Sequence, residues 1–183
     1  MENFVVYIVD KNDTIQYVNS AWEDFAKNNG AAGLNADWVI GKSIWPFIQG
    51  PEMQQLYRHC FENVRCSKKG VQIPCRCDSP NHRRFINLEI LPLDASGLEI
   101  RCLLIKEEER SEVPVFSNEI RRDKQSFGMC SVCNRVHISS VGWVEVEEAV
   151  GRLNMLSDYW LPSLTPTVCE DCHQVLERPA EIK

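Results

Sequence analysis

Two pairs of cysteines, each with the spacing C-x-x-C, constrain the fold of this chain more than any other feature. The first pair is Cys130 and Cys133, the second is Cys169 and Cys172, and 35 residues separate the pairs. A two-residue gap lets a tight turn direct both sulfurs at one ion, and two such pairs complete a tetrahedral shell. The sequence therefore predicts a closed, structural zinc site with these four ligands.

Two other interpretations of the two pairs stay open, and a third is disfavoured. Iron in a rubredoxin-like site needs the same four thiolates, and a thiol redox sensor would use each pair as a reversible dithiol and release its metal on oxidation. A purely apolar role is disfavoured, because Glu170 and Asp171 stand between the cysteines of the second pair. The gap is longer than the usual 15–20 residues. Loop closure costs only about 0.6 kcal/mol per doubling of length, so the gap permits one shared ion.

The composition and net charge of the chain argue against several classes of protein. The chain has 183 residues, nine cysteines and a net charge of −6. Nine is an odd number and the expected compartment is reducing, so disulfides are not expected. The negative charge makes nucleic acid an unlikely partner. Neither an apolar run of about 18 residues nor a signal-peptide pattern is present, which predicts a cytoplasmic protein without a membrane span.

The first half of the chain alternates strand and helix patterns. Residues 4–10 and 14–20 are rich in β-branched and aromatic residues and flank a turn, which predicts a hairpin. A short helix is expected after Ser20. A second helix is predicted from Pro51, because apolar residues recur there with helical periodicity: Met53, Leu56, Tyr57, Cys60, Phe61 and Val64.

Three further strands are predicted within residues 70–107. The segments 70–78 and 84–93 alternate apolar and polar residues, whereas 98–107 is mostly apolar and is expected to be a central strand covered on both faces. Two strands, helices and then three strands indicate an α+β fold with the helices on one face of the sheet.

This pattern resembles a PAS domain over residues 1–108, through the opening YIVDKNDTIQYVNSAWEDFAKNNG, the stretch VIGKSIWPF and the last three strands. The resemblance implies a five-stranded antiparallel sheet around a cavity for a ligand that the sequence does not identify. It also implies signal sensing, and a possible homodimer through this domain. The cysteine motif of flavin-based light sensors is absent, since Cys60 lies in His59-Cys60-Phe61. A haem or flavin sensor, with His59 as a conceivable haem ligand, stays as an alternative.

Residues 109–125 are charged and are predicted to be a linker or connector, and residues 126–183 a separate zinc-binding module. Asn134 suits a left-handed turn after the first pair. A hairpin is expected near 140–142, followed by a helical stripe within 146–153, and the second pair is expected to begin a helix. The order resembles a treble-clef or zinc-ribbon-like module, and a tail of some bacterial signalling proteins in which a Trp-containing helix separates two cysteine pairs.

Other candidate residues receive weaker interpretations. Cys60, Cys75, Cys77 and Cys102 fall on apolar faces, where a free thiol acts as a small hydrophobe. Cys75 and Cys77 with His82 are a conceivable second metal site, and His173 a conceivable substitute ligand. Arg83 and Arg84 are expected to pair with Asp78.

The sequence carries no nucleophile–base set and no phosphate-binding glycine loop. The predicted function is therefore non-enzymatic: a PAS sensor coupled to a structural zinc module, acting through protein–protein interaction with a signalling partner.

Overall fold

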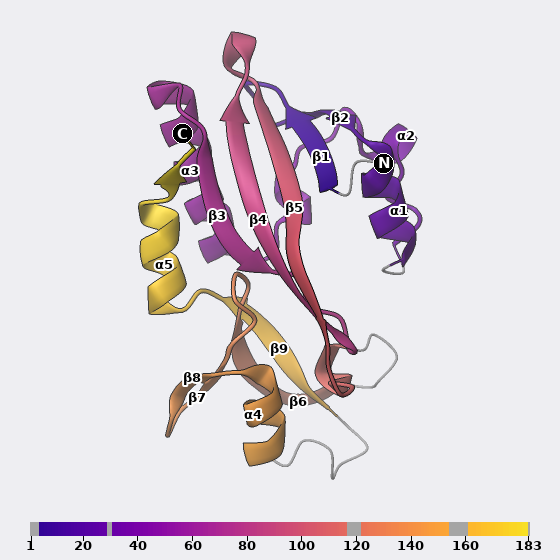
Figure 1. Ribbon diagram of the computed structural model, residues 1–183, viewed down its shortest axis with the longest axis vertical. Coiled ribbons are helices and arrows are strands. Elements are labelled where there is room, and N and C mark those ends of the chain that lie inside the picture. The colour runs from indigo at the N-terminus through magenta and orange to yellow at the C-terminus, as the bar shows by residue number, and fades with distance from the viewer. Residues whose placement is uncertain (1–3, 29–30, 117–121, 154–160, 183) are drawn as a thin grey trace.

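The computed structural model describes residues 4–28, 31–116, 122–153 and 161–182. A six-stranded antiparallel sheet forms one half of the molecule, with strand order β10-β3-β4-β5-β1-β2, and a four-stranded sheet in the order β8-β7-β6-β9 forms the other (Figure 1). The strands of the larger sheet are β1 (Phe4–Val9), β2 (Ile15–Val18), β3 (Val71–Arg76), β4 (His82–Pro92), β5 (Leu98–Glu109) and β10 (Ala180–Glu181). The predicted α+β class with five antiparallel strands is confirmed, and β10 adds a sixth strand.

The predicted hairpin of β1 and β2 turns at Asp10–Thr14. Asp10 fixes this turn, because its carboxylate accepts hydrogen bonds from the backbone N–H groups of Asn12 and Thr14 at 2.8 and 3.0 Å. Helices α1 (Ser20–Asn28) and α2 (Ala36–Val39) follow, and α1 packs beside β1. Asn19 joins helix and strand, since its side chain accepts from the Val6 N–H and donates to the Phe4 carbonyl.

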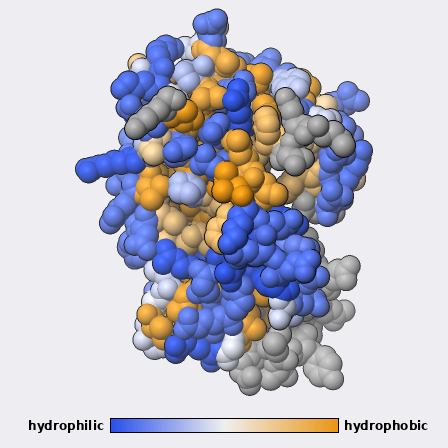
Figure 2. Space-filling view, in the orientation of Figure 1, coloured by the Kyte–Doolittle hydropathy of each residue, from blue (hydrophilic) through white to orange (hydrophobic). Residues whose placement is uncertain are grey.

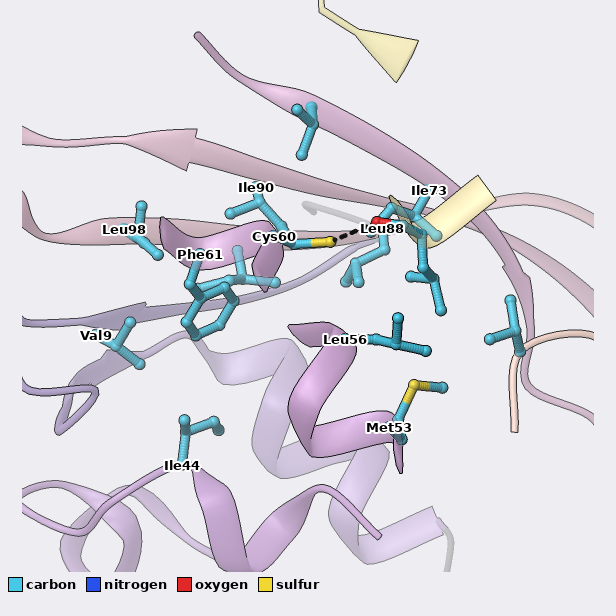
Figure 3. Close-up of a cluster of buried hydrophobic side chains, with 14 of the residues drawn as sticks. Val9, Ile44, Met53, Leu56, Cys60, Phe61, Ile73, Leu88, Ile90 and Leu98 are labelled. Carbon is cyan, nitrogen blue, oxygen red and sulfur yellow. Dashed lines mark hydrogen bonds between the residues drawn. The ribbon is translucent and has the colours of Figure 1, made fainter. Parts of the chain in front are cut away.

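Helix α3 (Pro51–Ser67) begins where its sequence predicts. Pro51 occupies the first helical position, where no N–H is needed, and Gly50 before it takes a φ of +86°, which glycine adopts without strain. The expected stripe faces inward: Met53, Leu56, Cys60, Phe61 and Val64 are buried. Figure 3 shows Phe61 of this helix near Ile90 and Leu98 of the sheet, with Leu56 and Met53 of the same buried cluster farther away.

Strand β5 lies between β4 and β1, so its central position is confirmed, but the prediction that both faces are covered is wrong for Leu104 and Ile105. These side chains are 45% and 66% exposed. The register against β4 shifts between Phe85 and Ile86, which pair with Lys106 and Leu104, so Ile105 is the extra residue of a β-bulge. Figure 2 shows hydrophobic residues among hydrophilic ones on the viewed surface.

The second half of the molecule contains β6 (Arg122–Cys130), β7 (Val136–Ile138), β8 (Gly142–Val144), α4 (Val146–Arg152), β9 (Leu161–Thr167) and α5 (Glu170–Glu177). The hairpin predicted near 140–142 is formed by β7 and β8, and the helical stripe is α4. Trp143 lies on β8 and not on the helix. Strand β9 pairs with β6 in parallel, an arrangement that the sequence did not indicate.

Contacts cross the predicted boundaries between residues 1–108, 109–125 and 126–183. Helix α5 packs on α3, β10 pairs with β3, and the Glu52 carboxylate accepts from the Val168 N–H at 3.1 Å (Figure 1). Within the predicted connector, β5 continues to Glu109 and Val113 and Val115 are buried, while 117–121 lie outside the described residues. No helix in the described ranges is long and apolar enough to span a membrane.

Candidate metal centre and adjoining cavity

The first cysteine pair sits in a tight turn at the end of β6. The Cys130 carbonyl accepts from the Asn134 N–H at 2.9 Å, and the Cys130 N–H donates to the Arg135 carbonyl at 2.8 Å. Asn134 closes the turn with a φ of +59°, in the left-handed region that asparagine tolerates, as expected. This backbone geometry turns the side chains of Cys130 and Cys133 to the same side.

The second pair begins helix α5, as predicted. Cys169 is the N-cap residue with extended backbone, and Cys172 lies in the first turn. The Cys169 N–H donates to the Cys130 sulfur at 3.4 Å, so the two pairs are in direct contact. The free N–H groups at the start of a helix favour negative charge nearby, which stabilises thiolates at these positions.

The four sulfur atoms lie within 4.8 Å of one another, and Cys133 Sγ is 3.8 Å from Cys169 Sγ. Zinc with Zn–S distances of about 2.3 Å in a tetrahedron requires sulfurs about 3.8 Å apart. A disulfide would require about 2.05 Å, and all nine cysteines are free thiols. The four cysteines singled out from the sequence therefore form one cluster that can hold a metal ion, with no coordination position left for a substrate.

Arg135 supplies positive charge to this cluster, a role that the sequence analysis missed. Its guanidinium donates to Cys133 Sγ at 3.2 Å, to Cys169 Sγ at 3.4 Å and to the Asp171 carboxylate at 2.8 Å. Hydrogen bonds from Cys130 and Cys172, together with Arg135, lower the pKa of Cys133. The hydrogen bond with Cys130 raises the pKa of Cys172. Negative charge in the metal-free cluster thus concentrates on Cys133, beside the arginine.

The other candidate ligands do not join a cluster. Within the described ranges only the four cysteines gather as potential metal ligands, so Cys75, Cys77 and His82 are not brought together. His59 is exposed and within hydrogen-bonding distance of Asn63, at 3.0 Å. His173 lies 3.6 Å from Glu177.

A cavity of about 970 Å³ lies between the larger sheet, α1 and the first cysteine turn. Three of the four cysteines expected on apolar faces contribute to its lining, namely Cys75, Cys77 and Cys102. Burial raises the pKa of Cys75 and of Cys102 to about 12, and also raises that of Cys77. These thiols are therefore protonated at neutral pH and act as weakly polar, uncharged wall groups.

Ion pairs connect the larger sheet to α4. Asp78 is fully buried and pairs with Arg76 and with Arg110, at 3.1 Å for the second pair. Arg110 also reaches Glu147 on α4 at 2.8 Å. The prediction that the side chains of Arg83 and Arg84 pair with Asp78 is wrong.

Arg83 pairs with Glu147 at 2.8 Å and Arg84 with Glu107 at 2.6 Å, while Arg84 meets Asp78 only through its backbone N–H. The carboxylate of Asp78 binds Arg76, two residues before it, and Arg110, farther along the chain.

Comparison with known proteins gave matches to solved structures only; no family model and no curated protein matches the chain. The PAS domain of the Cronobacter turicensis RpfR quorum-sensing receptor, in complex with C12:0, is 17% identical with a TM-score of 0.46. The match covers 58% of this chain and 97% of that one. A sensory box sensor histidine kinase from Vibrio cholerae is 14% identical with a TM-score of 0.44, over 57% and 83%.

The PAS domain of Bordetella pertussis BvgS is 17% identical with a TM-score of 0.39, over 56% of this chain and 73% of that one. The strand order β3-β4-β5-β1-β2, the helices packed on it and the cavity beneath α1 agree with the resemblance seen in the sequence. The chain thus combines a PAS-like α+β fold with a C-terminal cluster of four cysteines that can bind a metal.

Proposed function

We propose that this protein is a non-enzymatic signal-sensing and protein-interaction protein, in which a PAS sensor is coupled to a structural zinc module. The observation that carries the proposal is the cluster of four sulfurs within 4.8 Å of one another, which shares one hydrophobic core with the PAS-like sheet. A signal received in the cavity can therefore reach the C-terminal region through packed side chains.

Zinc is the proposed ion because the cluster offers four thiolates and no open position. Zinc has no redox chemistry of its own and favours this closed tetrahedral shell in structural sites. The ion would carry +2 against −4 from the thiolates, and the guanidinium of Arg135 offsets part of the remaining charge. Cys130, Cys133, Cys169 and Cys172 are its proposed ligands, in a zinc-ribbon or treble-clef-like module.

The proposal assigns no catalysed reaction to the protein. Output passes instead to a signalling protein partner in the cytoplasm. The proposal includes a homodimer formed through the PAS-like region. Light scattering after size-exclusion chromatography measures this directly. A dimer of the wild type that becomes a monomer in Ile105→Glu would support a sheet-mediated dimer, whereas a monomeric wild type would remove that part of the proposal.

Elemental analysis of protein purified under reducing conditions tests the metal. One zinc per chain is expected, with loss of the ion in Cys172→Ser and retention in Cys66→Ser, an exposed thiol outside the cluster. Iron in place of zinc would give a coloured rubredoxin-like protein. Protein without stoichiometric metal would favour the thiol redox sensor, and a haem or flavin absorption spectrum would favour the cofactor-binding alternative.

A further inference from the structure

The first cysteine turn is also a wall of the cavity. Ser131 and Val132, the two residues between Cys130 and Cys133, line it, and Leu176 of the ligand-bearing helix α5 lines it too. Val132 is 3% exposed and belongs to the same buried cluster as Ile73 and Leu88 of the larger sheet. Cys130 and Cys133 are thus bonded through the backbone directly to Ser131 and Val132, which line the cavity.

Backbone hydrogen bonds attach this wall on two sides. The Arg76 N–H of β3 donates to the Val132 carbonyl at 2.7 Å, and the Ser131 N–H donates to the Thr167 carbonyl at 2.9 Å. Thr167 itself lies two residues before Cys169. A change in the distance between the cysteine pairs therefore moves Ser131 and Val132 against the sheet and changes the shape of the cavity.

Apart from the exposed residue Asp24 of α1, the chemistry of the cavity lining fits an uncharged ligand. Most of the lining is apolar, and its cysteines are protonated thiols. The arginines in the lining are neutralised, Arg76 by Asp78 and Glu145, and Arg84 by Glu107.

Two phenols provide polar contacts. Tyr7 is 7% exposed, Tyr57 lies beside it, and neither hydroxyl has a hydrogen-bond partner among the residues described. Burial raises the pKa of both phenols, so each remains an uncharged donor. Neither oxygen is among the buried atoms left without a partner, so both hydroxyls reach the cavity space, where a ligand acceptor such as a carbonyl oxygen would accept a hydrogen bond from them.

We propose that the cavity binds a neutral, mainly apolar molecule with a hydrogen-bond acceptor, and that metal at the four cysteines strengthens this binding by fixing the Ser131–Val132 wall. This inference rests on the proposed function, because it needs the metal to bind. Linkage makes the effect reciprocal: the ligand must strengthen metal binding by the same factor.

The uncharged fluorophore N-phenyl-1-naphthylamine serves as the probe. Its dissociation constant is measured with full-length protein in three states: zinc-loaded, stripped with a chelator under reducing conditions, and reloaded. Binding is expected to be at least about fivefold tighter with zinc, the lower end of typical coupling, and to recover on reloading. Equilibrium competition with the chelator 4-(2-pyridylazo)resorcinol should show that saturating probe raises zinc affinity by the same factor.

Two matched variants distinguish an effect of the Ser131–Val132 wall on coupling from an effect of general stability. Val132→Ala removes two methyl groups from the wall and keeps every ligand, so zinc stays bound while the factor of about five falls toward one. Val136→Ala makes the same deletion in the buried core on β7, away from the cavity lining, and should keep the factor. Cys102→Phe fills the cavity and should abolish probe binding in the zinc-loaded protein.

Each outcome has one meaning. Equal probe affinity with and without zinc, or equal effects of Val132→Ala and Val136→Ala, overturns the coupling and leaves the metal site intact. Failure of the probe to bind the zinc-loaded protein overturns the proposed ligand class, and binding unchanged in Cys102→Phe overturns the assignment of the ligand to this cavity. Absence of bound zinc overturns the proposed function itself, and is seen in the elemental analysis before any probe is added.

Discussion

The two halves of the molecule are stabilised in different ways. The larger sheet and α3 enclose large apolar side chains, and Phe61, Ile90, Leu98 and Ile100 are almost fully buried. The separate core beneath α4 contains nine buried residues, six of them valines. Because hydrophobic stabilisation scales with buried apolar area, the second half must depend more on its four cysteines and on ion pairs. Loss of a metal ligand or of an ion pair should therefore destabilise the second half more than the first.

Substitution of a cysteine ligand is the most severe test of this comparison. In Cys130→Ser or Cys172→Ser we expect loss of the ion and unfolding of the C-terminal module, because binding of structural zinc contributes on the order of 10 kcal/mol. The PAS-like sheet should persist. Zinc content and thermal unfolding followed by circular dichroism provide the measurement, with Cys66→Ser as control. Unchanged zinc and unchanged melting in either ligand variant would contradict the dependence on metal.

Asp78→Asn should have the next largest effect. The substitution leaves Arg76 and Arg110 without their shared buried carboxylate, and breaking a buried ion pair costs about 3–5 kcal/mol. Chemical denaturation measures the free energy of unfolding. Glu148→Gln, in an exposed pair with Arg152, is the control and should change it by less than about 0.5 kcal/mol. Equal effects of both variants would mean that the ion network does not hold the halves together.

Leu176→Ala tests the contact between α5 and α3. Leu176 is fully buried, and its carbonyl accepts from the Cys60 thiol at 3.2 Å, the dashed contact in Figure 3. We expect a loss of about 2–3 kcal/mol, the low end for leucine to alanine, because the adjoining cavity already limits packing. Leu104→Ala, at a half-exposed position, should cost less. The same denaturation experiment would show an error if Leu104→Ala proved the more damaging.

Arg135→Gln should weaken metal binding without unfolding the protein. Removal of the positive charge next to two sulfurs disfavours the negatively charged site, and loss of such a supporting group typically costs 10–100-fold in affinity. We expect about tenfold, measured by competition with a colorimetric chelator. Arg152→Gln, remote from the sulfurs, should leave the affinity unchanged. An unaltered affinity in Arg135→Gln would show that the guanidinium does not support the metal.

A small pH effect is expected at Glu147. Burial would raise its pKa, but hydrogen bonds from Arg83 and Arg110 outweigh it, and the net pKa is lowered. A lowered folded-state pKa stabilises the protein above the unfolded value of about 4.3, and this stability disappears as pH falls through the folded pKa. The difference in unfolding free energy between wild type and Glu147→Gln should therefore shrink below about pH 4.5. A constant difference from pH 7 to 3 would contradict the assignment.

Local patterns in the sequence predicted most elements correctly. Asn134 indicated the left-handed turn, Pro51 the start of α3, and the cysteine spacing identified the four residues that meet. Each of these signals acts within a few residues of the chain. The partners of Arg83, Arg84 and Asp78 were wrong because a pairing across strands depends on register, which composition does not reveal.

Long-range pairings were also missed. The parallel pairing of β6 and β9 has no local signal, and the prolines of β9, Pro162 and Pro166, favour a position at the edge of a sheet without naming its neighbour. Strand β10 has only two residues. The placement of Ser131 and Val132 against the cavity follows from the packing of both halves together, and was not visible in the spacing of the cysteines.

Residues of the C-terminal region also cover the backbone hydrogen-bonding groups on the outer edge of β3. Every second residue of this strand turns its backbone polar groups away from β4. The Gly70 carbonyl accepts from Ile182, Gln72 pairs with Ala180, Pro74 has no N–H, and Arg76 donates to Val132. The outer edge is thereby blocked against strand addition, a common origin of sheet aggregation. Loss of the ordered cysteine turn or of residues 180–182 would open it to self-association.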